Sequence, residues 1–327
     1  MTKFNTLFIA LCITAGISAC NSGASGTSQA STASAHSGGI SPLVQNGTPV
    51  TDPRLNSMVP VIYIKVSSTS GDICTGTLID STTILTASHC VLNMAAKKNN
   101  IDYTASNVTD PSNITILFSN DLSTPVDINK QQSINNSTEY AVSNIYVHKD
   151  AFRGAEVFES GTGFQISNNA DINDLAILKL SKAVPNSDYQ YPILAQSNPS
   201  AGQTEIIAGY GVDLGTGVTV KDTESGQSGL LRSANTSVNG FQANGMLIDM
   251  GGKVTAGSGK TYYTKICQGD SGGPDFIDNG SDEALTITGV HSFGDGADCG
   301  SPNTPATSVS VASYYDWING GYLNYHI

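Results

Sequence analysis

The chain has 327 residues, of which 13% are charged and 34 are glycine. This composition favours a β-rich fold with many turns over a helical one, so we expect an all-β protein. Fifteen basic against 27 acidic residues give a net charge of −12, which argues against binding nucleic acid or an anionic membrane through charge. The sequence has no His-Glu-x-x-His motif or close cysteine pair to hold zinc, and we expect no metal or cofactor.

The first residues have the pattern of a secretory signal. Lys3 is positively charged, and residues 4–17 are mostly apolar but too few to span a membrane. The ending Ile17-Ser18-Ala19-Cys20 is similar to the bacterial lipobox, whose cysteine becomes the lipid-bearing first residue. We therefore expect residues 1–19 to be removed and Cys20 to anchor an exported lipoprotein in the cell envelope. The alternative is an ordinary cut after Ala19, which leaves Cys20 as a spare thiol in a secreted protein.

A tether and then a folded domain follow the signal. Residues 21–39 are almost all Ser, Ala, Gly, Thr and Asn, so residues 20–43 are predicted to form a flexible tether or propeptide. Apolar content rises at Val44, and we expect one folded domain over residues 44–327. Runs rich in β-branched residues predict strands at residues 58–66, 74–79 and 83–86.

A histidine follows the third of these strands, in the stretch Thr86-Ala87-Ser88-His89-Cys90. A lone histidine is more often structural than catalytic, and only its neighbours make His89 a candidate for chemistry. Residues 93–173 are rich in Asn, Ser and Thr and are predicted to be mainly a solvated surface insertion, with strands at residues 114–118 and 140–147.

An aspartate heads the next apolar strand, in Asn173-Asp174-Leu175-Ala176-Ile177. A carboxylate in that place is partly buried and needs hydrogen-bond donors, for which a histidine N–H is well suited. The alternative is an ordinary strand-end or turn aspartate. Further strands are expected at residues 204–208, 231–238, 246–249, 276–278, 285–291 and 307–311, and one C-terminal helix at residues 314–318 packs Trp317 and Ile318 against the body.

Near the C-terminus, Gln268-Gly269-Asp270-Ser271-Gly272-Gly273 surrounds a serine with glycines. Glycine has no Cβ, so backbone N–H groups there can approach a reacting atom closely. A serine hydroxyl is a weak nucleophile by itself and needs a base and an orienting acid. His89 and Asp174 are the candidates for those two roles.

The cysteines indicate an oxidising compartment. Of the six, Cys12 belongs to the signal and Cys20 to the lipid site, which leaves an even number in the folded domain. Two disulfides are expected, and sequence alone permits three pairings. The remaining cysteines are Cys74, Cys90, Cys267 and Cys299.

With these motifs in their order, the chain resembles the trypsin/chymotrypsin-like serine peptidases over roughly residues 44 to 320. The order His, Asp, Ser is that family's. The supporting points are Cys74-Thr75-Gly76-Thr77-Leu78-Ile79, Gly209-Tyr210-Gly211, Ser292-Phe293-Gly294 and the terminal Tyr315-Asp316-Trp317-Ile318.

The resemblance implies two six-stranded antiparallel β-barrels packed face to face, with an endopeptidase site between them and protein or peptide substrates. Ser271 would attack the scissile carbonyl, His89 would take and return the proton, and Asp174 would orient the imidazole. The N–H groups of Gly269 and Ser271 would form the oxyanion hole. Matching positions suggest the disulfides Cys74–Cys90 and Cys267–Cys299.

The sequence departs from trypsin at the position of the substrate-pocket floor, where an acidic residue is replaced by Lys265. Cleavage after Arg or Lys is therefore not expected. His291 falls where glutamate-specific relatives carry histidine, so Lys265 and His291 suggest a pocket for Glu or Asp, walled by Ser292, Phe293 and Gly294. A lysine that pairs with Asp298, or that points outward, is the equally weighted alternative.

Activation in this family commonly frees an Ile or Val amine, which pairs with the aspartate before the nucleophile. Val44 and Asp270 are the candidates here, with Ile40 next. Leu43 precedes Val44, so a trypsin-type activating peptidase is not indicated. We expect a membrane-tethered zymogen that is released on cleavage. The rival hypothesis is a catalytically inactive binding protein on the same fold.

Overall fold

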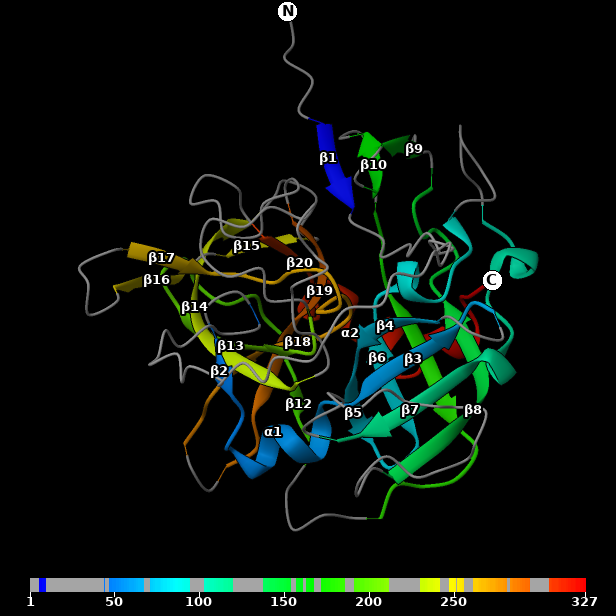
Figure 1. Ribbon diagram of the computed structural model, residues 1–327, viewed down its shortest axis with the longest axis horizontal. Helices are drawn as coiled ribbons and strands as arrows, with labels where there is room; N and C mark the ends of the chain where they lie inside the picture. The colour runs from blue at the N-terminus through cyan, green and yellow to red at the C-terminus, as the bar shows by residue number, and fades with distance from the viewer. Residues whose placement is uncertain are drawn as a thin grey trace, which may run out of the picture.

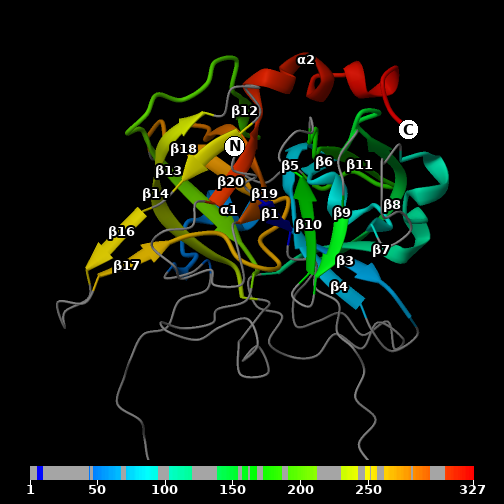
Figure 2. The same ribbon diagram turned by 90° about the horizontal axis from the view of Figure 1, so that it is seen from above.

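A computed structural model describes residues 6–9, 44, 47–67, 71–94, 103–119, 138–153, 157–160, 163–167, 172–185, 191–211, 230–241, 247–250, 252–255, 261–280, 283–294 and 306–327. Two β-barrels lie side by side in both views of the chain (Figures 1 and 2). The N-terminal barrel holds the blue-to-green strands and the C-terminal barrel holds the yellow-to-orange strands, so each barrel is built mainly from one half of the sequence.

The first barrel is a sheet of order β4-β3-β7-β8-β11-β6-β5, antiparallel throughout. Only Gly76 separates β4 from β5, and a Cβ at Gly76 would overlap the side chains of Ile84 and Ile62. One continuous segment therefore pairs with β3 at one end and with β6 at the other, which closes a ring of six strands. The bounds are β3 Val61–Lys65, β4 Gly71–Thr75, β5 Thr77–Asp80, β6 Thr83–Thr86, β7 Ile114–Phe118, β8 Thr138–Val147 and β11 Ala176–Leu180.

The second barrel is a closed antiparallel ring in the order β19-β18-β13-β14-β15-β20, with β20 pairing back to β19. The short strand β12 adds to β19 in parallel, and β2 adds to β14. The two predicted six-stranded barrels are confirmed, and β12 is a parallel addition to them. The bounds are β2 Thr48–Pro49, β12 Ile193–Leu194, β13 Thr204–Gly209, β14 Arg232–Phe241, β15 Leu247–Met250, β18 Pro274–Ile277, β19 Thr286–Gly294 and β20 Ala306–Ser310.

The helical segments are short. Helix α1 (Pro53–Met58) was not predicted, and placing Met58 in a strand was wrong. The Asp52 side chain accepts a hydrogen bond from the Arg54 N–H at 2.9 Å, and Pro53 opens the first turn, so ordinary helix-start signals explain α1. Helix α2 (Tyr315–Ile318) buries Trp317 and Ile318 as expected. In the part of the chain that the structure describes, the 3-10 turns are Ser88–Cys90, Ala105–Asn107, Pro111–Asn113, Ala312–Tyr314 and Gly321–Leu323.

Two small sheets were also missed. Within the predicted surface insertion, β9 (Val157–Ser160) pairs with β10 (Gly163–Ser167), and β10 pairs in turn with β1 (Thr6–Ile9). Part of the predicted signal thus extends the edge of a sheet, because an extended segment there gains backbone hydrogen bonds. The second small sheet is the hairpin of β16 (Gly252–Thr255) and β17 (Thr261–Thr264).

The chain crosses between the barrels at both ends. Near its start, β2 pairs with β14 of the second barrel before β3 enters the first. After β20, α2 and the C-terminus return over the first barrel, as Figure 2 shows at its top. The loop after β6, the loop before β11 and the loop before β18 meet between the barrels. There, Ser292 of β19 contacts Asp174 of the first barrel.

Candidate active site

The register of two strands brings His89 to Asp174. In the β6–β11 pair, Thr86 lies opposite Ala176, so the residues just beyond β6 and just before β11 leave the sheet at the same edge. His89 is 2% exposed and Asp174 is fully buried. The Nδ1 atom of His89 lies 2.7 Å from Oδ2 of Asp174. The two residues that the sequence analysis singled out separately therefore form a pair.

Asp174 also accepts three further hydrogen bonds. The hydroxyls of Ser88 and Ser292 donate at 2.7 and 2.6 Å, and the His89 backbone N–H donates at 2.9 Å. Burial raises the pKa of Asp174, but the charge of His89 and these hydrogen bonds outweigh it and hold the pKa below its ordinary value. Asp174 is therefore ionised at neutral pH, so His89 Nδ1 carries a proton and donates it to the carboxylate.

Two serines bind Asp174 in a way that the sequence did not indicate. Ser292, which is predicted to line the substrate pocket, is 2% exposed and its hydroxyl donates to Asp174. Ser88 was not predicted to have a role. The only sequence signal for Ser88 is its place beside His89, and the hydrogen bond depends on the fold bringing residue 174 to it.

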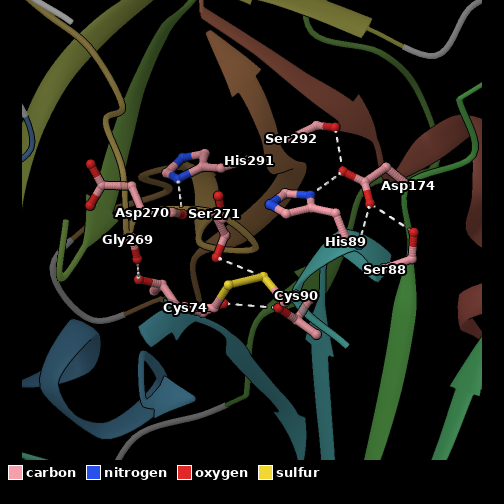
Figure 3. Close-up of a disulfide and its surroundings, with 12 residues drawn as sticks. Cys74, Ser88, His89, Cys90, Asp174, Gly269, Asp270, Ser271, His291 and Ser292 are labelled. Carbon is pink, nitrogen blue, oxygen red and sulfur yellow. Dashed lines mark hydrogen bonds and ion pairs between the residues drawn. A yellow bond between two sulfur atoms is a disulfide. The ribbon is translucent and has the colours of Figure 1, made fainter. Parts of the chain in front are cut away.

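The other ring nitrogen of His89 faces the nucleophile candidate. Nε2 is buried and has no hydrogen-bond partner within the described residues. Figure 3 shows the Ser271 side chain beside the edge of the His89 ring that points away from Asp174. With Nδ1 protonated, Nε2 has a free lone pair in the position of a general base.

The loop around Ser271 leaves two backbone donors unused. The N–H groups of Asp270, Gly272 and Gly273 donate to Cys267 O, His291 O and Asp270 O at 3.0, 2.8 and 2.9 Å. The N–H groups of Gly269 and Ser271 donate to nothing among the described residues. Gly269 and Gly272 have φ angles of 94° and 79°, a region that favours glycine. The glycines thus give the loop a shape in which these two donors stay free for a ligand.

Thr75 of the first barrel holds the Ser271 loop through two hydrogen bonds. Its N–H donates to Ser271 O and its hydroxyl donates to Gly269 O, both at 2.8 Å. A Cβ on Gly272 would overlap the Thr86 hydroxyl and the Thr75 carbonyl, which shows how closely the loop approaches the first barrel. Thr75 belongs to the motif of residues 74–79, but nothing in that motif indicates its contacts with the Ser271 loop.

Asp270 is fully buried below the loop. In the intact chain, Oδ1 accepts from Gly211 N–H and Oδ2 from Cys267 N–H, both at 2.8 Å. Burial raises the pKa of Asp270 to about 6, against the lowering effects of the His291 charge and these two bonds. Val44 is also fully buried, in a small apolar cluster of the second barrel with Ile207, Val238, Ile266 and Ala306.

The predicted pocket residues lie inward. Lys265 is 4% exposed and Phe293 is 4% exposed, and Gly294 ends β19. His291 is fully buried, with Nε2 at 3.0 Å from Asp275 Oδ1 and Nδ1 at 3.1 Å from Asp270 O. Both ring nitrogens of His291 therefore bind groups of the protein, and neither is left to receive a substrate carboxylate.

One predicted disulfide is present and braces the site. Cys74 and Cys90 are bonded, with Cα atoms 6.2 Å apart, which joins β4 to the turn that carries His89. Cys267 is also disulfide-bonded, and its predicted partner Cys299 lies outside the described residues, as do Asp298, Cys20, Ile40 and Leu43. Ligand atoms of Cys74, His89 and Cys90 lie within 4.8 Å of one another, but disulfide sulfurs are poor metal ligands, so this group does not form a metal site.

No helix among the described residues is long and apolar enough to cross a membrane.

Comparisons with known proteins point to one family. A family model described as Trypsin matches residues 51–318. Coagulation factor XII of Cavia porcellus is 27% identical over 270 residues, which cover 78% of this chain and 38% of that protein. Serine protease 7 of Drosophila melanogaster is 23% identical over 288 residues, which cover 84% of this chain and 64% of that protein. Clotting factor G beta subunit of Tachypleus tridentatus is 26% identical over 265 residues, which cover 75% of this chain and 70% of that protein. The chain spans less than two thirds of the first two relatives.

Proposed function

We propose that this chain, which belongs to the trypsin family of serine proteases, is an endopeptidase that cleaves peptide bonds with Ser271 as nucleophile. The single observation that carries the proposal is the His89–Asp174 pair at 2.7 Å with Nε2 of His89 unbonded among the described residues. That arrangement supplies the base and the orienting acid that a serine hydroxyl requires.

The proposed reaction passes through an acyl-enzyme. As Ser271 Oγ attacks the scissile carbonyl carbon, its proton moves to His89 Nε2, and the carbonyl π electrons move to oxygen. When the tetrahedral intermediate collapses, the C–N bond breaks and His89 gives that proton to the leaving amine. Water then attacks the ester in the same way, which releases the acid and restores Ser271. Asp174 stays ionised and stabilises the imidazolium.

The oxyanion is proposed to bind the N–H groups of Gly269 and Ser271. Support comes from their lack of acceptors among the described residues, while the neighbouring N–H groups are used within the loop. Donors already held in place need no reorganisation during the reaction, and one such donor is worth about a hundredfold or more in rate.

For specificity, we propose that cleavage after Arg or Lys is disfavoured and that Glu or Asp is preferred. The positive charge of Lys265 supports this proposal, although Lys265, like His291, already has an interaction partner within the protein. Peptides that differ only at the cleaved residue (Glu, Asp, Arg, Phe, Ala) test it. Faster cleavage after Arg than after Glu would overturn it, and a Lys265→Ala variant that keeps the same order of substrates would remove Lys265 from the explanation.

Activation is proposed to follow cleavage before Val44, whose freed amine would pair with Asp270. Support comes from the burial of Val44 in the second barrel, the barrel to which Asp270 also connects through Gly211. A lipid on Cys20 and a bacterial envelope location rest on the lipobox-like ending alone, whereas coagulation factor XII and the other two relatives are animal proteins. N-terminal sequencing of active protein tests the activation cleavage, because active material beginning at Cys20 contradicts release at Val44.

Covalent labelling separates a peptidase from an inactive binding protein. We expect a fluorophosphonate to label the activated protein, and Ser271→Ala to abolish both labelling and cleavage. Ser143→Ala is the matched control, because Ser143 is an exposed serine of β8 that donates to Lys179 O. Absence of labelling in activated, folded wild type would favour the inactive binding protein.

A further inference from the structure

The second barrel encloses three ionisable side chains that the proposed mechanism does not use. Glu205 of β13, Asp275 of β18 and His291 of β19 are each fully buried. His291 Nε2 lies 3.0 Å from Asp275 Oδ1. The Thr288 hydroxyl lies 2.5 Å from Glu205 Oε1 and 3.1 Å from Asp275 O, which links the two acidic residues. Burying an ionisable side chain costs free energy unless a hydrogen-bond partner or a bound proton compensates its charge.

The contacts of His291 determine where its protons lie. Nδ1 faces the main-chain oxygen of Asp270, which can only accept, so Nδ1 carries a proton. Nε2 faces an Asp275 oxygen, and one proton lies between them. Burial lowers the pKa of His291, but Asp275 and Asp270 outweigh it and raise the pKa above its ordinary value. A raised pKa favours the charged ring, in which Nε2 donates to the Asp275 side chain.

Among the described residues, the charged groups that act on His291 are two aspartates. Asp275 faces it from β18 and Asp270 from the nucleophile loop, while β20 presents the uncharged Ser308 opposite it. Glu205 is linked to Asp275 through the Thr288 hydroxyl. Burial together with the Asp275 charge raises the pKa of Glu205 to about 8. At neutral pH, Glu205 is thus an uncharged acid, and Asp275 is the acidic residue that His291 contacts directly.

His291 connects this cluster to the proposed nucleophile. Its ring donates to Asp270 O at 3.1 Å, its N–H donates to Gly273 O at 2.8 Å, and its carbonyl accepts from Gly272 N–H at 2.8 Å. These bonds attach to the chain on both sides of Ser271. A Cβ on Gly273 would lie too close to His291 Nδ1, so the ring packs directly against the loop.

We propose that Asp275 is a positioning residue for Ser271: it keeps His291 doubly protonated, and the charged ring braces the loop that presents Ser271 and the two proposed oxyanion donors. The inference rests on the proposed function for its kinetic consequence, whereas the charge of His291 is inferred from its contacts with Asp270 O and Asp275. A charge-assisted hydrogen bond is roughly twice as strong as a neutral one, so the charge on the ring matters for the rigidity of the loop.

Nitrogen NMR of the histidines tests the charge directly. In 15N-histidine-labelled Ser271→Ala protein at pH 7, the signals of His291, assigned with a His291→Gln variant, should show both nitrogens protonated. Asp275→Asn keeps the size of the side chain and removes its charge, so His291 should become neutral with a single protonated nitrogen. A singly protonated His291 in the parent protein at pH 7 would overturn the proposal, even where Asp275→Asn does not fold.

Kinetics test the positioning role. Asp275→Asn should lower kcat roughly tenfold or more and leave KM within about twofold. Glu205→Gln is the matched control, because it replaces a neutral acid by a neutral amide in the same cluster, and at pH 7 it should keep both kcat and the His291 signals. An unchanged kcat in folded Asp275→Asn, or an equal loss in Glu205→Gln, contradicts the positioning role. A wild type that neither cleaves peptides nor reacts with fluorophosphonate would refute the peptidase proposal and leave the NMR result standing.

Discussion

Replacing Glu205 by Gln should make the stability of the protein less dependent on pH. Glu205 is fully buried, its Oε1 accepts from Thr288, and its Oε2 has no partner in the described part of the chain. Burial and the neighbouring Asp275 raise its pKa from an ordinary 4.5 to about 8. The folded state therefore holds a proton that the unfolded state releases above pH 4.5.

The sign and size follow from this difference. A folded-state pKa above the unfolded one contributes stability that is complete below pH 4.5 and is lost as the pH rises toward 8. One pKa unit corresponds to about 1.4 kcal/mol, so the wild type should lose about 4 kcal/mol between pH 5 and pH 9 from this group. The Gln variant has no proton to lose there and should lack this decline.

Urea unfolding at pH 5, 7 and 9 measures the effect, with both proteins carrying Ser271→Ala to prevent self-digestion. The raised pKa of Asp270, about 6, adds a decline of the same sign, but that decline is common to both proteins and cancels in the comparison. The free energies of unfolding should diverge in favour of the Gln variant as the pH rises. Parallel curves would refute the assignment of Glu205 as a buried neutral acid.

Three further perturbations address the site and its supports. Ser88→Ala removes one donor from the Asp174 carboxylate and should lower kcat/KM about tenfold by steady-state kinetics, and an unchanged value would show that the remaining donors suffice. Gly272→Ala adds a Cβ that overlaps main-chain atoms at a positive φ, and it should lower the free energy of unfolding by more than about 2 kcal/mol in thermal unfolding. Gly202→Ala is the control, because Gly202 also has a positive φ but open space around it, and this change should cost about 1 kcal/mol. Equal losses would contradict the packing argument. Replacing Cys74 and Cys90 together by Ala should cost about 3 kcal/mol in urea unfolding, and no loss would mean that the disulfide does not restrict the unfolded chain.

Local sequence signals were enough to predict many strands and to identify the motifs of the candidate site. Strand runs are marked by β-branched residues and turns, and His89, Asp174 and Ser271 stand out because nucleophilic chemistry needs these residue types in distinctive surroundings. Helix α1 was missed although Asp52 and Pro53 carry its start signal, because the apolar run after it favoured a strand that began too early.

What the sequence by itself determined is therefore the barrel architecture, by resemblance, and which residues are candidates for chemistry. Tertiary structure decided their partners. Ser292 binds Asp174 and His291 binds Asp275, and the sequence pattern indicates neither contact. The physical reason is that such contacts join positions far apart in the chain, and only strand register and barrel closure decide which side chains meet. A motif marks a residue, but the hydrogen bonds that set its charge come from elements that the motif does not contain.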